Sequence, residues 1–365
     1  MPALLAETCL RAVDWHDADT LAGWDDLARM AGEPNPFLER WYLLPALSTM
    51  GASDVRLLCF RVEGALAGLM PLTASRRYYG RPLPHLAAWT HPNAFLGAPL
   101  VARGMERAFW QALLAHADAR AGAGLFLHLA QIPLAGRLTD ALRDVLARQK
   151  RPHGLVWREE RAALASDLSP EAYLETAMSG KKRKELRRQH TRLSELGALT
   201  MERLRDDRGL ADWIEDFLKL EQAGWKGAAG SALACAPGTA DLFRQALQGA
   251  AQAGRLERLA LRLDGRPIAM LASFLTPPMG FSYKTAFDEH FARFSPGVLL
   301  QRDNLTMLTD PAIAMTDSCA SADHPMIDHI WRERRAVGHV SIGIGGRIRR
   351  ALFGQVLKRE RQVEW

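Results

Sequence analysis

Cysteines are few in this sequence, and their spacing fits no metal-binding or disulfide pattern. The four, Cys9, Cys59, Cys235 and Cys319, lie far apart, and no C-x-x-C pair occurs among the 365 residues. Such spacing argues against zinc ribbons and disulfide-stapled domains and is typical of the reducing cytoplasm. We therefore expect a cytoplasmic protein without a metal centre.

Long apolar runs are also missing. The longest run without charge, residues 267–283, is interrupted by Pro277, Pro278 and Gly280, so two buried strands joined by a turn explain it better than a membrane span. Charged residues from Glu7 onward leave no apolar core for a signal peptide. We expect no transmembrane segment.

Several catalytic motifs are absent as well. The sequence contains no P-loop, no H-E-x-x-H and no G-x-S-x-G. A glycine-rich stretch at 343–346 follows an expected strand, but no βαβ unit comes after it, which argues against a dinucleotide site.

The length and composition are those of a two-domain globular protein. Apolar residues make up 48% and charged residues 24%, and 365 residues exceed one typical domain. We expect an α/β (α+β) protein of two modules, residues 1–160 and 161–346, followed by a basic tail helix at 347–365. Each module is predicted to contain a mixed, mostly antiparallel sheet flanked by helices.

The two halves show the same order of expected elements. The first half predicts two helices between residues 20 and 50, a hairpin at 55–73, strands at 95–101, 125–129 and 154–157, and helices at 105–121 and 134–148. The second half predicts a hairpin at 256–276, strands at 280–287, 313–316 and 339–344, and helices at 296–308 and around 325–335. Extra helices are expected at 169–177, 181–196, 210–225 and 239–253. The turns Glu63-Gly64 and Asp264-Gly265 align, which favours a duplicated unit.

The segment 281–300, FSYKTAFDEHFARFSPGVLL, is the centre of the predicted site. It begins as a buried strand with Phe281, Tyr283, Thr285 and Phe287 on one face and Ser282, Lys284, Ala286 and Asp288 on the other. Ser295 before Pro296 and Gly297 predicts a capped helix start. Because free amides and the positive dipole end of a helix point the same way, we expect this junction to hold an acyl donor through an anionic group.

Lys284 is the strongest single candidate for chemistry. A lysine inside an apolar strand is costly unless it is paired or lies at a cleft. There it would neutralise the oxyanion formed when an acyl carbonyl is attacked. Asp288 and His290 are candidates for the general base, with plain loop positions as the alternative.

A basic run at 181–192 is the strongest charge feature. It is either a solvated helix face or a surface on which Arg183 and Arg187, one turn apart, bind phosphate or carboxylate. No aromatic residue interleaves the run, so nucleic acid is the less favoured partner.

Two residue pairs have both a structural and a functional interpretation. Glu221 and Trp225 at i, i+4 form either a helix end with a buried tryptophan or a carboxylate that acts as a base beside an acceptor. Cys319 and His324 are a conceivable nucleophilic pair, but a buried cysteine near a loop histidine is the simpler interpretation.

The order of elements resembles the GNAT acyltransferase fold, and four stretches resemble its CelD/BcsL-like branch. They are KKRKELRRQHTRLSELG at 181–197, EQAGWKG at 221–227, YKTAFDEHFARFSPGVLL at 283–300 and DHPMIDHIWRERR at 323–335. Members of this branch are described as acetyltransferases linked to cellulose or exopolysaccharide biosynthesis, and they are similar to the tandem-GNAT FemABX peptidyltransferases. The resemblance covers about residues 165–335, while the first half matches in layout.

The resemblance implies that acyl-CoA, such as acetyl-CoA, binds at Ser295, Pro296, Gly297, Val298 and Leu299. It implies Lys284, Asp288 and Glu221 as catalytic residues, and Arg183, Arg187, Trp225 and Tyr283 as residues that line the acceptor side. The common pyrophosphate loop Q/R-x-x-G-x-G/A is not matched by RFSPGV at 293–298. The first half has no comparable loop, and we expect it to be catalytically silent.

The leading hypothesis is direct acyl transfer from acyl-CoA to a sugar or envelope-polymer precursor, in association with polysaccharide machinery. One alternative is a FemABX-like transferase that takes aminoacyl groups from tRNA. The other is a non-catalytic module in polysaccharide biosynthesis.

Overall fold

The computed structural model describes residues 7–360 and 362–365 and divides into two compact units. Unit 1 comprises Met1–Glu159 and Ala336–Trp365, and unit 2 comprises Glu160–Arg335. The predicted end of the second module at residue 346 was wrong. From Val337 to Gly343 the chain pairs with a strand of unit 1, and these hydrogen bonds tie both this segment and the tail helix to that unit.

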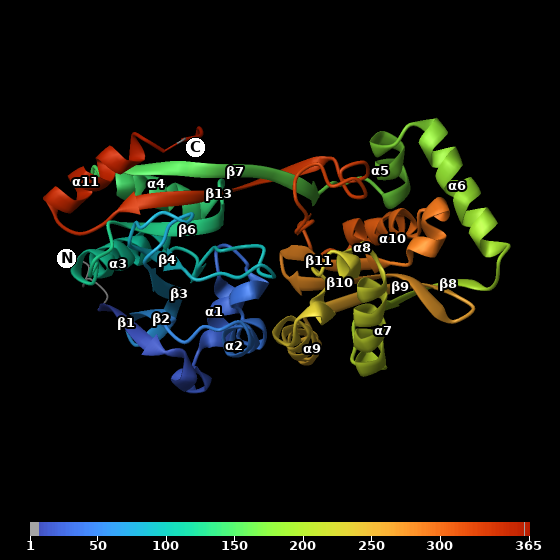
Figure 1. Ribbon diagram of the computed structural model, residues 1–365, viewed down its shortest axis with the longest axis horizontal. Coiled ribbons are helices and arrows are strands. Elements are labelled where there is room, and N and C mark those ends of the chain that lie inside the picture. The colour runs from blue at the N-terminus through green and yellow to red at the C-terminus, as the bar shows by residue number, and fades with distance from the viewer. Residues whose placement is uncertain (1–6, 361) are drawn as a thin grey trace. The chain divides into compact units, whose positions relative to one another are not determined.

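Unit 1 contains a mostly antiparallel sheet flanked by helices (Figure 1). Its strands are β1 (Thr8–Asp14), β2 (Arg56–Val62), β3 (Ala65–Ser75), β4 (His85–Ala88), β5 (Leu100–Val101), β6 (Phe126–Pro133) and parts of β7 (His153–Leu164) and β13 (Glu333–Gly343). Its helices are α1 (Trp24–Met30), α2 (Arg40–Thr49), α3 (Glu106–Ala119), α4 (Arg137–Arg148) and α11 (Arg347–Leu357). The strand order is β1-β2-β3-β4-β6-β13-β7, with β5 on β3 and β4 parallel to β6.

Unit 2 is built in the same manner. Its strands are β8 (Leu199–Leu204), β9 (Leu256–Leu263), β10 (Arg266–Thr276), β11 (Met279–Phe287) and β12 (Met315–Asp317), in the order β12-β11-β10-β9-β8 after the end of β7. Its helices are α5 (Pro170–Ala177), α6 (Gly180–Ser194), α7 (Leu210–Ala223), α8 (Trp225–Ala228), α9 (Pro237–Gln252) and α10 (Pro296–Asn304), with 3-10 segments η4 (Glu289–Phe294) and η5 (Leu305–Thr309). Strands β11 and β12 are parallel.

The predicted duplication is visible in the order of elements. In each unit an antiparallel hairpin precedes a third strand, a helix, and a strand parallel to the third. Both hairpin turns have positive φ at their two central residues, Glu63-Gly64 and Asp264-Gly265. Two-residue turns of this kind match the twist of the strands they join, which is why acidic-glycine pairs occur at both places.

Three sequence predictions of secondary structure differ from the structure. The third strand of unit 1 is β4, between the hairpin at 55–73 and the strand predicted at 95–101, where no strand was expected. Of the predicted strand, only Leu100 and Val101 pair with β3. Turns rather than a helix precede β13 at 325–332. The edge strands β1 and β8 were not predicted, because half-exposed strands lack a continuous apolar pattern.

The sheet of unit 2 is covered on both faces (Figure 1). Leu299 and Leu300 of α10 join an apolar core with Leu259, Ile268 and Leu271 of the sheet. On the opposite face α7 and α9 pack against the strands, with Phe243 of α9 beside Tyr283 of β11. Each fully buried leucine contributes about 2 kcal/mol to folding, so the two cores fix the strands that carry the candidate site.

Candidate functional site

Strands β11 and β12 pair over three residues and then part. Met279, Gly280 and Phe281 pair with Met315, Thr316 and Asp317, where β12 ends. Strand β11 continues to Phe287, and within the described residues 7–360 and 362–365 no strand pairs with 282–287 on that side. This edge of the sheet is therefore open to a ligand that lies alongside the strand.

A β-bulge at Tyr283 changes which side chains share a face. Ala272 is opposite Lys284, whereas its neighbour Ser273 is opposite Ser282, so Tyr283 is the extra residue. The Lys284 ammonium lies 5.6 Å from the centre of the Tyr283 ring. The predicted alternation, with these two residues on opposite faces, was wrong because a bulge turns consecutive side chains toward the same side.

Lys284 is half-buried and lies in a cluster of charged groups. Its pKa is lowered to about 8, first because burial disfavours the ammonium and second because Lys226 repels it, while Glu221 has the opposite effect. A lysine with such a pKa is charged at neutral pH but gives up its proton within the physiological range, as groups at reaction centres often do.

Glu221 holds Lys226 in place. One carboxylate oxygen accepts a hydrogen bond from the Lys226 ammonium at 2.8 Å, and the other accepts from the Leu233 N–H at 2.8 Å. The same ammonium donates to the Thr285 carbonyl on the open edge of β11 at 3.3 Å. Both oxygens of Glu221 thus have partners, and the geometry suits a residue that positions Lys226.

Trp225 does not share a helix with Glu221 as predicted, because the chain breaks between α7 and α8 at the extended residue Gly224. The indole is 58% exposed, which excludes the interpretation of a buried tryptophan at a helix end. Its backbone N–H donates to a Glu289 carboxylate oxygen at 2.7 Å. Glu289 thereby fixes the start of α8, next to Lys226.

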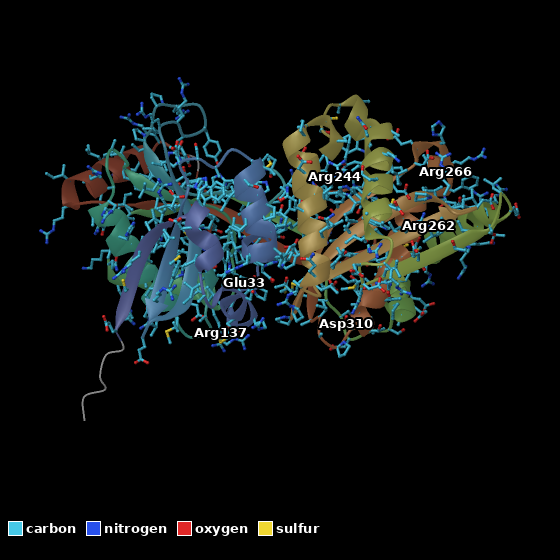
Figure 2. All side chains as sticks on the ribbon, turned by 90° about the horizontal axis from the view of Figure 1, so that it is seen from below. Glu33, Arg137, Arg244, Arg262, Arg266 and Asp310 are labelled. Carbon is cyan, nitrogen blue, oxygen red and sulfur yellow. The ribbon has the colours of Figure 1, made fainter. Side chains whose placement is uncertain are left out.

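Asp288 lies away from these contacts and caps η4. Its buried carboxylate accepts from the His290 N–H at 3.0 Å and contacts the His290 ring at 2.8 Å. The guanidinium of Arg266, labelled in Figure 2, donates to its second oxygen at 2.7 Å. The structure therefore gives Asp288 structural partners, and no contact places it at Lys284 in the part of the chain that is described.

The start of α10 is partly covered. Ser295 has left-handed φ and ψ of 53° and 51°, and its hydroxyl does not cap the helix, contrary to the prediction. Pro296, Gly297 and Leu299 are buried, whereas Ser295 and Val298 are half-buried. Met326 lies against Gly297, with its sulfur 2.3 Å from where a Cβ would be. An uncapped first turn leaves amides for an anion, which must approach from the side of Ser295 and Val298.

Residues 180–323, from α6 to just beyond β12, match the family model described as acetyltransferase (GNAT) domain. The match supports an acyltransferase of the GNAT class. It covers the segments that carry Lys284, Glu221 and Lys226. A comparison with curated proteins finds no match for the chain.

Solved structures share the fold over both units of this chain. FemX aligns over 96% of this chain and 100% of its own length, with 10% identity and a TM-score of 0.56. The C-terminal domain (DUF2156) of a proposed lysylphosphatidylglycerol synthetase from Agrobacterium fabrum aligns over 95% and 100%, with 13% identity and a TM-score of 0.55. At 10% and 13% identity, these two comparisons show a shared fold. Every helix in the described part of this chain is too short or too polar to cross a membrane.

The basic helix α6 lies beside η4. Gln189 donates to the Arg293 carbonyl of η4 at 3.4 Å, so α6 lies beside the segment that leads into α10. Arg183 is half-buried and lies 3.5 Å from Glu175, whereas Arg187 is exposed. The predicted pair is therefore not brought to Lys284 by any contact among the described residues, but lies on the helix next to η4.

Cys319 is a poor nucleophile in this environment. The thiol is buried, and burial raises its pKa far above the usual value. His324 has a lowered pKa because of burial and the nearby Lys226 charge, and its Nδ1 contacts the Met326 N–H at 3.4 Å. The structure thus supports the simpler interpretation of this pair.

No sequence pattern pointed to Lys226 or Glu289, which the structure brings next to Glu221 and Trp225. Lys226 lies five residues after Glu221, a spacing that does not place two side chains on one face of a continuous helix. The signal that could have found it was Gly224 between them, because a glycine inside a helical pattern marks a possible break.

Proposed function

We propose that unit 2 transfers an acyl group from acyl-CoA to an amine or hydroxyl acceptor at the open edge of β11. The observation that carries this proposal is a half-buried, protonated Lys284 next to that edge, with the Glu221–Lys226 pair beside it. A cationic donor in a partly dry site stabilises charge that develops on an attacked carbonyl oxygen.

The residues present fit an acyl-CoA donor. The edge of β11 that no other strand covers within the described residues suits its pantetheine arm, which would lie along it as an added strand does. The uncapped start of α10 and the exposed Arg187 lie on elements that suit its phosphates. Met326 over Gly297 restricts the approach of these phosphates to one side of the helix start.

The proposed step is a direct displacement. The acceptor nitrogen or oxygen attacks the thioester carbon, the new bond forms, and the carbon–sulfur bond breaks with release of CoA, which takes up the proton lost by the acceptor. Lys284 stabilises the oxyanion of the intermediate. Glu221 acts through Lys226 by fixing its position, and we assign Asp288 to the fold of η4.

A saccharide is the proposed acceptor class. The exposed indole of Trp225 offers a broad apolar face with a polar edge next to Lys226. Such a surface suits the apolar face of a sugar ring, while the charged pair suits its hydroxyl or amino groups. This agrees with the resemblance to the CelD/BcsL-like branch and its link to envelope polysaccharides, which remains a proposal for this chain.

Transfer is tested with labelled acetyl-CoA and a panel of amino sugars, neutral sugars and oligosaccharides. We expect Lys284→Met to lower kcat about 100-fold with CoA affinity unchanged, since the interaction acts on the transition state. Lys219→Met, a change of an exposed lysine on α7, is the matched control and should retain full activity. Acetyl-CoA binding without transfer to any acceptor would favour the non-catalytic alternative.

A second candidate is transfer of an aminoacyl group from tRNA. The exposed cations of α6, such as Lys182 and Arg187, and the fold likeness to FemX favour it. It predicts tRNA binding that weakens steeply with salt and with Lys182→Glu or Arg187→Glu. Absent or salt-insensitive binding would eliminate this candidate.

We propose that unit 1 holds no donor, because the stretch Ala102-Arg103-Gly104 that leads to α3 does not resemble the Ser295-Pro296 start of α10. One cavity beside β4, the strand that corresponds to β11, is lined by residues such as Met70, Trp89 and Leu96 and has a volume of about 10 Å³. A space of that size accommodates a single water molecule.

A further inference from the structure

Helix α11 of unit 1 presents apolar side chains to solvent. Ile348 is 81% exposed and Leu352 is 56% exposed, and the two lie one turn apart on the same face. Val356, a further turn along, is half-buried. The acyl-transfer proposal, which concerns unit 2, gives this face no role.

The helix is held firmly, so this exposure belongs to the folded state. Phe353 and Leu357 on its inner face are buried against Tyr78 and Phe126. The Arg349 guanidinium donates to the carbonyls of Gly122 and Gly124 at 2.8 and 3.0 Å. A helix with an anchored inner face displays its outer side chains in a defined arrangement.

The start of α11 already has an anionic partner within the protein. The Asp118 carboxylate accepts from the Gly345 N–H at 2.8 Å, from Arg151 at 2.6 Å and from Arg350 at 2.6 Å. An anion at a helix N-terminus satisfies the dipole and the free amides there. Asp118 therefore already occupies the anion site at the start of α11, and a lipid phosphate would bind to exposed cations elsewhere on the helix.

Exposed cations flank the apolar pair at the two ends of the helix. Arg347, Lys358 and Arg359 are exposed, and none forms an ion pair within residues 7–360 and 362–365. The loop that carries Arg76, Arg77 and Arg81 adjoins the end of the helix, because the Tyr78 hydroxyl donates to Glu360 at 2.7 Å. Figure 1 shows α11, in red, at the edge of unit 1.

We propose that this outer face of α11 docks the protein on a membrane surface rich in anionic phospholipids. Ile348 and Leu352 enter the boundary between headgroups and acyl chains, and the basic residues around them bind lipid phosphates. An exposed apolar stripe flanked by lysine and arginine is the combination that interfacial helices use. Charge complementarity favours an anionic membrane, because a purely apolar partner would leave the six exposed cations named above without counter-charges.

The experiment is sedimentation of the full-length protein with phosphatidylcholine vesicles that contain about one third phosphatidylglycerol. We expect binding that falls about ten-fold in Ile348→Asp/Leu352→Asp and in Lys358→Glu/Arg359→Glu, and that falls likewise at about 0.5 M salt. Met30→Asp, a change at a 54% exposed methionine of α1, is the matched control and should bind as the wild type does.

Four results would overturn the docking proposal. They are no sedimentation of the folded wild type, equal binding to pure phosphatidylcholine, unchanged binding of both double variants, or self-association that the Ile348→Asp/Leu352→Asp change abolishes while vesicles are not bound. None of these readouts depends on acyl transfer.

Discussion

Lys284 has its lowered pKa of about 8 because burial and, after it, Lys226 disfavour its charge, and the opposing effects of Glu221 and Cys319 are smaller. If the ammonium stabilises an oxyanion, the protonated form is the active one. That form predominates below pH 8 and is lost above it. We therefore predict that kcat/KM falls as pH rises through about 8, as measured in a pH–rate profile under steady-state conditions. A rise over the same interval would instead assign Lys284 the role of a base.

Two neighbours of Lys284 test this assignment, because removing their charges should shift the pKa of Lys284 in opposite directions. Lys226→Met removes a like charge, so the pKa of Lys284 should rise and the falling limb should move to higher pH. Glu221→Gln removes an opposite charge, so the limb should move to lower pH. If kcat/KM falls at the same pH in both variants and in the wild type, a group other than Lys284 controls the pH–rate profile.

Cys319 should be dispensable for chemistry. Since burial keeps its thiol protonated, we predict that Cys319→Ala retains kcat within about two-fold and that mass spectrometry finds no acyl group on the wild-type protein during turnover. A covalent acyl-enzyme on Cys319 would replace direct displacement with a two-step mechanism.

At the scale of single elements, the helix start at α10 depends on a close contact. Gly297 leaves room for Met326, and a methyl group there would meet its sulfur at 2.3 Å. We predict that Gly297→Ala lowers the free energy of unfolding by about 1–3 kcal/mol, as measured by urea denaturation. In a Met326→Ala background the same change should cost about 1 kcal/mol less, because the clash is gone.

Gly180→Ala is the control for the Gly297 series. Gly180 begins α6, has no close neighbour at the Cβ position, and does not have positive φ. Alanine there should be neutral or slightly stabilising. Equal losses from Gly297→Ala in both Met326 backgrounds would indicate that the contact with Met326 does not determine the cost.

The elements also show why parts of the site could not be predicted from sequence. The lysine in an apolar strand pointed to Lys284, and the hairpin turns pointed to the duplication. The bulge at Tyr283 and the break at Gly224 depend on tertiary packing, and each changes which side chains meet. Alternation and i, i+4 spacing assume regular strands and helices, so they placed Tyr283 and Lys284 on opposite faces and missed Lys226.

At the scale of the whole chain, the expected α/β class and mostly antiparallel sheets are present, and the error lies in the path of the last strand. Strand β13 completes unit 1 by hydrogen bonding to β6, a partner about two hundred residues earlier. No local pattern encodes a pairing across such a separation. The two units meet between Glu159 and Glu160, just before the element types repeat.

The stability of unit 2 should depend on a buried charge cluster around Asp317. Asp317 at the end of β12 is fully buried and contacts Arg335 at 2.8 Å and Arg161 at 3.1 Å. We predict that Asp317→Asn lowers the free energy of unfolding by roughly 3 kcal/mol, because two buried guanidinium groups lose a shared counter-charge. Asp207→Asn, at an exposed position, is the control and should change urea stability by less than about 0.5 kcal/mol. A small effect at Asp317 would mean that other groups neutralise this pair.

Every step proposed for unit 2 requires that acyl-CoA binds to this chain and places its thioester beside Lys284. Calorimetric titration of the full-length protein with acetyl-CoA tests this most directly. We predict saturable binding of about one acetyl-CoA per chain with a Kd well below about 1 mM, unchanged in Lys284→Met. Absence of binding up to about 1 mM ligand, with the protein shown to be folded, would contradict the account.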